Sequence, residues 1–109
     1  MDFQVIYPKE IAAMQQEKGA LVVDLREWKE YQASHWSGAR WYEFEDAKEL
    51  GRQLPTERPI ILYCDHGGMS MVIAKKLAKT HHIYSVIGGY EGMKKIQENY
   101  FKNGWNMRQ

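Results

Sequence analysis

The chain has 109 residues, of which 44% are hydrophobic and 27% charged, as expected for one folded domain in water. Its formal net charge of +1 gives no strongly basic surface, so we expect neither nucleic acid nor a membrane as a partner. The longest apolar runs are far shorter than the roughly 20 residues that cross a bilayer, and residues 1–10 show no secretory signal. Cys64 is the single cysteine, which excludes an internal disulfide and fits the reducing cytoplasm, where we expect the protein to act.

Short β-prone runs alternate with longer amphipathic segments, the pattern of a parallel sheet covered by helices. FQVIY at 3–7 predicts the first strand, and residues 8–17 predict a helix that ends at Gly19. ALVVD at 20–24 is apolar as far as Asp24, which is typical of a central strand buried on both faces. The remaining predicted elements are a helix at 26–34, a strand region at 41–44, a helix at 45–54, a strand at 60–64, a helix at 70–80, a strand at 82–87 and a helix at 91–101.

No linker or change of composition interrupts these elements, so we expect a single domain over residues 1–109. In the helix after the fourth strand, the spacing of Val72, Ile73 and Leu77 places these side chains toward the core. The aromatic tail at 100–109 either folds back over the sheet edge or presents a surface to a partner.

Cys64 lies at the carboxyl end of a predicted strand, where sites form in parallel α/β sheets, and Asp24 and the turn at Gly88 follow other strands. The loop after Cys64 opens a helix, whose first N–H groups would point back toward the sulfur. Such donors stabilise a thiolate, the reactive form of cysteine. Gly67 and Gly68 can supply the positive φ angles that a curled loop needs. The alternative is that Cys64 is a buried thiol without a chemical role.

Three stretches of the sequence resemble signatures of rhodanese-like domains. LVVDLREWKEYQASHWSGARWYEF resembles the first signature, an apolar strand ending in D-x-R followed by an acidic, aromatic helix and H-x-x-G-A. The matching positions are Asp24, Arg26, Glu30, Tyr31, His35, Gly38 and Ala39. PIILYCDHGGMS resembles the second signature, a strand, the catalytic cysteine and a six-residue active loop that opens a helix. VIGGYEGM resembles the final strand and glycine turn of the family.

The resemblance implies a three-layer α/β fold, in which helices flank both faces of a central parallel sheet of about five strands. It implies a sulfurtransferase in which Cys64 takes the outer sulfur of a small donor and carries it as a persulfide. The sulfur then passes to a thiol or other nucleophilic acceptor, which can be a protein. No metal or organic cofactor is required. Backbone N–H groups of residues 65–69 would hold the persulfide anion. From their positions after one strand, we expect Asp24 and Arg26 to form an ion pair or hydrogen bonds that brace the loops; the alternative is direct contact with the substrate. The active-site loop comprises Asp65, His66, Gly67, Gly68, Met69 and Ser70.

The active loop departs from the pattern of family members that handle thiosulfate. Such loops usually carry arginine or lysine just after the cysteine and at the last loop position, where this chain has Asp65 and Met69. A carboxylate near the sulfur repels a dianion, and only a protonated His66 would partly offset it. We therefore expect a polysulfide or a protein persulfide as the donor. Phosphatases of the same fold need a C-x5-R loop, whose arginine is missing here.

Two other functions stay open at this point. The domain could be a binding or regulatory module in which Cys64 is spare, or a redox sensor that oxidises this thiol reversibly. A metal centre is not expected, because the adjacent His81 and His82 point to opposite sides of an extended segment. We expect Glu30 and His35 to be helix-surface and loop-anchoring residues rather than a catalytic acid and base.

Overall fold

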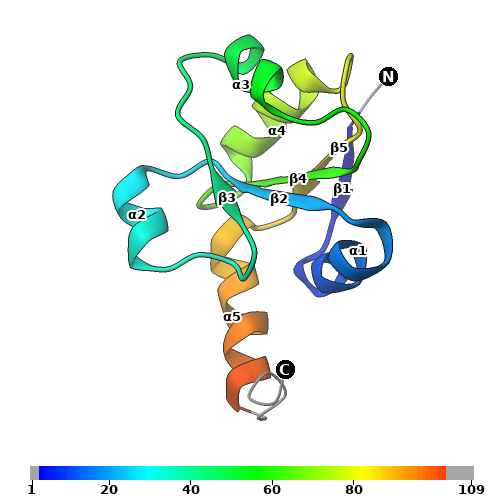
Figure 1. Ribbon diagram of the computed structural model, residues 1–109. Helices are drawn as coiled ribbons and strands as arrows, with labels where there is room; N and C mark the ends of the chain where they lie inside the picture. The colour runs from blue at the N-terminus through cyan, green and yellow to red at the C-terminus, as the bar shows by residue number, and fades with distance from the viewer. Residues whose placement is uncertain (1–2, 103–109) are drawn as a thin grey trace.

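A five-stranded parallel sheet runs through the centre of the protein (Figure 1). The computed structural model describes residues 3–102, with side chains as far as residue 99. The strands lie in the order β1-β5-β4-β2-β3, and every neighbouring pair is parallel. Their bounds are β1 (Gln4–Ile6), β2 (Leu21–Asp24), β3 (Arg40–Trp41), β4 (Ile60–Tyr63) and β5 (Ile83–Val86). The sheet is therefore the parallel one that the sequence predicted.

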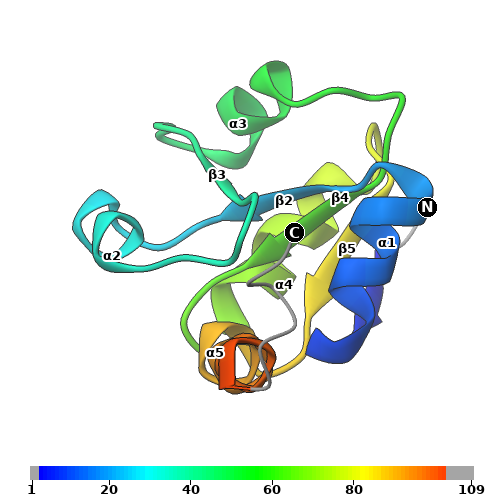
Figure 2. The ribbon, with the colours of Figure 1, turned by 60° about the horizontal axis from the view of Figure 1, so that its bottom comes forward.

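Helices cover both faces of the sheet, which confirms the three-layer α/β prediction (Figure 2). Their bounds are α1 (Ile11–Lys18), preceded by the 3-10 turn η1 (Pro8–Glu10), α2 (Trp28–Ala33), α3 (Ala47–Gln53), α4 (Gly68–Leu77) and α5 (Gly89–Lys102). α3 and α4 lie on one face, α1 and α5 lie on the other, and α2 stands beyond the carboxyl end of β2. The loops after β2 and β4 therefore meet at one edge of the sheet.

Side-chain alternation along the two central strands builds the two halves of the core. The cluster under α3 and α4 contains Leu21, Val23, Ile60 and Leu62. The cluster under α1 and α5 contains Val22, Ile61 and Tyr63. Because Cys64 comes one position after Tyr63, it belongs to the first cluster, on the face that α4 covers.

The start of α4 differs from the sequence prediction. α4 begins two residues before the predicted start at Ser70, because Gly67 adopts a left-handed φ of 101° and closes the loop early. Ser70, Ala74 and Leu77 then share the buried side of the helix. Val72, predicted to face the core, is 58% exposed, so that prediction is wrong.

Two other differences concern the edge of the sheet and the chain end. β3 is shorter than the predicted 41–44 region and begins one residue earlier. Tyr42 and Phe44 follow it and are half-buried against the cluster under α3 and α4. α5 begins two residues earlier than predicted. The predicted tail at 100–109 lies outside the described residues, apart from the backbone of 100–102 within α5.

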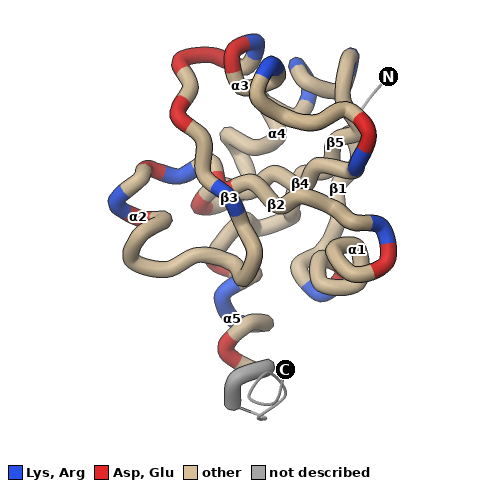
Figure 3. The backbone as a smooth tube through the Cα atoms, in the orientation of Figure 1, with Lys and Arg blue, Asp and Glu red and all other residues tan. Residues whose placement is uncertain are grey.

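Charged residues of both signs are spread over the helices and loops, while β4 carries none (Figure 3). This distribution agrees with the small net charge of the chain. Within residues 3–102, no helix has the length and apolar character needed to cross a membrane.

Candidate active site

Cys64 lies where β4 meets the loop that leads into α4, and 7% of the residue is exposed. Its Sγ accepts hydrogen bonds from the backbone N–H of Gly67 at 3.2 Å and of Ser70 at 3.3 Å. Donors at the start of a helix favour negative charge on the sulfur, and the thiolate is the form of cysteine that attacks. The geometry can therefore support a nucleophilic sulfur.

The N–H groups that contact Sγ overlap only in part with those at residues 65–69, whose expected contact with a persulfide anion stays a prediction. Within the described hydrogen bonds, only Gly67 from that set donates to Sγ, and the second donor is Ser70, one position beyond it. Gly67 has the predicted positive φ, whereas Gly68 does not, because it already begins α4. The early start of α4 therefore places the Ser70 N–H within reach of the sulfur.

A hydrogen bond between two buried hydroxyl groups connects Ser70 to strand β5. The Ser70 Oγ donates to the carbonyl of Gly67 at 3.1 Å and lies 2.7 Å from the Oγ of Ser85 on β5. Because the single proton of Ser70 is engaged by Gly67, Ser85 is the donor in the second bond. Both serines are buried, with exposed fractions of 0% and 1%. The position of the Ser70 N–H is thus tied to the sheet.

The turn between β5 and α5 supports the active loop from its other side. The Tyr90 N–H donates to the carbonyl of Cys64 at 2.8 Å. Gly89 has a φ of 59°, and a Cβ at this position would lie 2.5 Å from the Cys64 carbonyl oxygen and 2.6 Å from that of Asp65. Gly88, the predicted turn residue, precedes it with a φ of 79°. Only glycine fits at position 89 without a shift of the loop.

Asp24, at the end of β2, is buried and accepts hydrogen bonds from four donor groups. Its Oδ1 accepts from the backbone N–H of Arg26 at 2.8 Å and from Nε at 3.1 Å. Its Oδ2 accepts from Arg26 Nη2 at 2.8 Å and from the Tyr63 hydroxyl at 2.5 Å. Arg26 Nη2 also donates to the carbonyl of Ser34 at 2.6 Å. The expected Asp24–Arg26 ion pair is therefore present, and it joins β2, β4 and the end of α2.

This network shifts the pKa values of two of its members. Burial opposes the charge of Arg26, but the hydrogen bonds and charge of Asp24 outweigh it, so the pKa of Arg26 is raised. Burial, and then the hydrogen bond to Asp24, raise the pKa of Tyr63 far above its usual range. The guanidinium also lies over the ring of Tyr90, with Cζ 4.0 Å from the centroid. Arg26 is thus a fixed cation that Asp24 balances.

The site and the order of its elements agree with one known family, since residues 7–96 match the rhodanese-like domain. The chain belongs to this family. Thiosulfate sulfurtransferase GlpE of Pseudomonas putida is 30% identical over 92 residues, which cover 83% of this chain and 84% of the relative. GlpE of Pseudomonas fluorescens is 34% identical over the same length. A rhodanese-related protein from Thermoplasma volcanium has the same fold, with a TM-score of 0.76 at 18% identity, covering 85% of this chain and 92% of that one.

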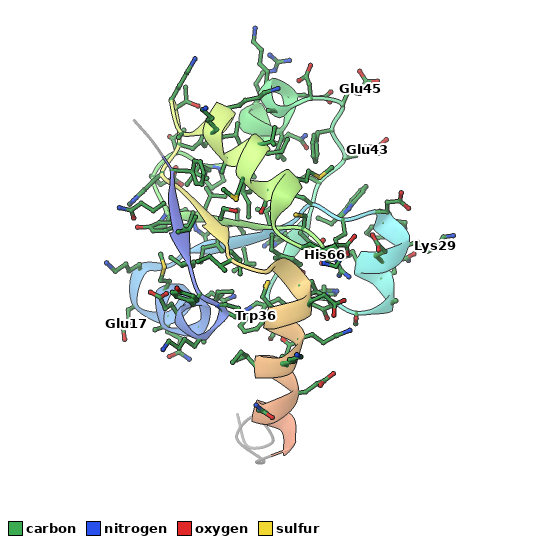
Figure 4. All side chains as sticks on the ribbon, turned by 180° about the vertical axis from the view of Figure 1, so that it is seen from behind. Glu17, Lys29, Trp36, Glu43, Glu45 and His66 are labelled. Atoms are coloured by element: carbon green, nitrogen blue, oxygen red, sulfur yellow. The ribbon has the colours of Figure 1, made fainter. Side chains whose placement is uncertain are left out.

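A pocket of about 530 Å³ opens beside Cys64 in this rhodanese-like domain. Its walls come from the segment after β2 and from the active loop, and they include Leu25, Arg26, Glu27, Glu30, Asp65, His66 and Met69. Figure 4 shows His66 between the start of α4 and α2. The pocket thus has three carboxylates and one guanidinium, whose charge Asp24 already balances. Met69, which stands where a loop that handles thiosulfate is expected to carry a basic residue, is 53% exposed.

Other residues singled out in the sequence make local contacts. Glu30 Oε1 accepts from the backbone N–H of Glu27 at 3.1 Å, and His35 Nδ1 lies 2.8 Å from the carbonyl of Tyr31. His35 thus has the loop-anchoring contact expected of it, whereas Glu30 is half-buried and also lines the pocket beside Cys64. His81 is half-buried while its neighbour is exposed. Among residues 3–99, no group of three His, Cys, Asp or Glu side chains could hold a metal ion.

Three residues that shape the site were not singled out in the sequence. Tyr63 could have been found from strand register, because it pairs with Asp24 across β2 and β4. Gly89 had a weaker signal as the second residue of a glycine pair after a strand. Ser85 had none, because a serine within a strand usually indicates a solvent-facing position.

Proposed function

We propose that this rhodanese-like domain is a sulfurtransferase that carries sulfane sulfur as a persulfide on Cys64. The observation that supports this most directly is the contact of Sγ with two backbone N–H groups beside an open pocket. The single thiol must stay reduced to react, which fits action in the cytoplasm. The relatives named thiosulfate sulfurtransferase support the reaction class.

The proposed reaction has two steps that use the same sulfur atom of Cys64. In the first step, the Cys64 thiolate attacks the outer sulfur of R–S–SH, the donor S–S bond breaks, and R–S⁻ leaves. In the second step, an acceptor thiolate attacks the outer sulfur of the Cys64 persulfide and the cysteine leaves as a thiolate. Gly67 and Ser70 then face negative charge on Sγ both before and after the transfer, so their N–H groups need no rearrangement.

The proposed donor is a polysulfide or a protein persulfide rather than thiosulfate. Thiosulfate carries two negative charges, and the pocket offers three carboxylates against one balanced guanidinium. Like charges at short range weaken binding, most of all in a partly enclosed site. A donor with less negative charge fits this pocket better.

Intact-protein mass spectrometry tests the proposal. The protein is incubated briefly with polysulfide and, separately, with thiosulfate, and compared with Cys64→Ser. We expect polysulfide to add the mass of one sulfur atom, cyanide or reductant to remove it, and Cys64→Ser to show no addition. Because serine is nearly the same size, the variant should unfold at a similar denaturant concentration, which serves as its control.

The other outcomes decide between the remaining functions. Addition from thiosulfate at least as fast as from polysulfide would contradict the proposed donor. No addition from either would contradict sulfur transfer and favour a binding module. A stable sulfenic acid or mixed disulfide on Cys64 after mild oxidation, without persulfide formation, would favour a redox sensor.

A further inference from the structure

The outer side of α4 carries an apolar surface beside the active-site pocket. Seven large hydrophobic side chains are exposed among the described residues, and three of them are on the first two turns of α4. Met69 and Val72, three residues apart on one side of the helix, are 53% and 58% exposed, and we call them the α4 surface. Met71, 47% exposed, lies on another side of α4. Met69 also lines the pocket, so this surface is continuous with the site of Cys64. Clustered apolar side chains beside a reactive group are typical of a surface that docks a protein.

The pocket end of the α4 surface is acidic. Glu27 and Glu30 line one wall of the pocket and Asp65 lines the other. The ion pairs found among the described side chains involve none of these three carboxylates. Lys29 is also on α2, but in Figure 4 it points outward to solvent. A partner that reaches Cys64 therefore meets negative charge.

The far end of the α4 surface is basic. Lys75 and Lys76, in the last turn of α4, are exposed. Residues 69, 72 and 76 follow one another at helical spacing, so they form one stripe that is apolar first and basic afterwards. From the pocket to the end of α4, the surface is therefore acidic, then apolar, then basic. A partner with the complementary order of residues can bind in one orientation only.

We propose that Cys64 exchanges sulfur with a protein whose reactive cysteine is flanked by basic residues, and that this protein docks on the α4 surface. The partner's basic residues face the pocket carboxylates, its apolar residues cover Met69 and Val72, and its acidic residues lie toward Lys76. This inference rests on the proposed function, because it names the class of its acceptor. A small dianion matches neither the apolar surface nor the acidic pocket.

The transfer step that this docking serves is balanced in atoms and charge. The partner's cysteine thiolate attacks the outer sulfur of the Cys64 persulfide, forming the new S–S bond. The bond within the Cys64 persulfide breaks, and its electron pair leaves on Cys64 as a thiolate. The partner then holds the persulfide, and no oxidant or reductant is consumed. Basic residues beside the partner's cysteine favour its thiolate form.

The first measurement is the affinity of the unloaded protein for three labelled peptides, by fluorescence anisotropy. Each peptide has a central serine in place of the reactive cysteine, followed by two leucines, and the serine is flanked by lysines, serines or glutamates. Each exposed opposite-charge pair changes a binding constant by about twofold to fivefold. We expect the lysine peptide to bind about tenfold more tightly than the glutamate peptide, and the difference to shrink at high salt.

Two pairs of variants locate the binding. Glu30→Gln combined with Asp65→Asn should reduce the tenfold preference to about twofold, while the glutamine keeps the helix-capping acceptor. Glu17→Gln removes the same kind of charge from α1, on the other side of the molecule in Figure 4, and should leave the preference unchanged. Val72→Ser should reduce the affinity for the lysine peptide by about threefold, because an apolar contact with the peptide is lost. Val5→Ser, at a similarly exposed valine on β1, should not.

Three results would overturn the inference. The first is equal binding of the lysine and glutamate peptides, and the second is an equal loss of preference in Glu17→Gln. The third is that cysteamine fully displaces the lysine peptide and that Val72→Ser does not change the affinity for this peptide. That result would identify a small cationic thiol, instead of a protein, as the ligand. The binding assay needs no sulfur on Cys64. Failure of polysulfide loading would therefore count against the proposed function alone, and failure of the charge preference against the docking alone.

Discussion

Alanine substitutions at the adjacent residues Gly88 and Gly89 test whether the turn between β5 and α5 holds the active loop in place. Both have a positive φ, so alanine at either position costs about 1–2 kcal/mol from the backbone conformation alone. At position 88 nothing lies within 4 Å of the new Cβ, whereas at position 89 the Cys64 carbonyl oxygen lies at 2.5 Å. Ordinary contacts begin near 3.4 Å, so the loop must move by about 0.9 Å.

That movement should break the hydrogen bond from the Tyr90 N–H to the Cys64 carbonyl, which measures 2.8 Å. Loss of a buried backbone bond costs about 1–3 kcal/mol when the carbonyl is left without a donor. We therefore expect Gly89→Ala to lower the free energy of unfolding by about 2–5 kcal/mol and Gly88→Ala by about 1–2 kcal/mol. Urea unfolding of both variants, with equal m-values, measures this difference.

The same movement shifts Cys64 relative to its N–H donors, so Gly89→Ala should load sulfur from polysulfide at least about tenfold more slowly, the factor that 1.4 kcal/mol gives. Gly88→Ala should load at the rate of the unsubstituted protein. Equal destabilisation by the two variants would refute the steric argument. Normal loading in a folded Gly89→Ala protein would refute the link between this turn and the active loop.

Three further predictions concern the polar groups around the site. The raised pKa of Tyr63 means that its protonated hydroxyl stabilises the fold below about pH 10, and that this contribution is lost as the pH rises. The free energy of unfolding should therefore fall more steeply above about pH 10 than in Tyr63→Phe, by up to about 1.4 kcal/mol per pH unit, and equal slopes would contradict this. Ser85→Ala should cost about 1 kcal/mol and slow the loading of Cys64 severalfold, because Ser70 loses its buried partner; unchanged loading would make the hydroxyl pair incidental. Met69→Arg should raise kcat/KM for thiosulfate by about threefold to tenfold, and no gain would point to Asp65 or the loop shape as the limit.

The sequence predicted the sheet and the position of Cys64 because both depend on local patterns. Continuous apolar runs ending at Asp24 and Cys64 placed the central strands, and the following glycines placed the active loop. The resemblance to rhodanese-like domains, which the family match confirms, supplied the connection between these segments. The Asp24–Arg26 ion pair was also predictable, because two residues of opposite charge follow one strand end.

What the sequence could not predict depends on how the elements pack. The spacing of Val72 with Ile73 and Leu77 predicts an inward side chain, but the small residues at 70 and 74 let the opposite side of α4 approach the sheet. Ser70 joined the sulfur contacts because a left-handed Gly67 started the helix early, which no spacing rule shows. Ser85 acts through a partner fifteen residues away in the chain, on a different element. Each of these is a matter of tertiary context rather than of local preference.

Main-chain groups hold Cys64 in place, whereas exposed side chains line the pocket beside it. This division determines which substitutions can change the specificity of the site. The backbone N–H groups of residues 67 and 70 bind the sulfur of Cys64, and that of residue 90 binds the Cys64 carbonyl. A substitution that changes only a side chain does not remove these donors. Asp65, His66 and Met69, in contrast, are exposed and form no part of the core. If the proposed sulfur transfer holds, substitutions at these three positions should change which sulfur compound is accepted, at little cost to folding. One scaffold can in this way be adapted to donors of very different charge.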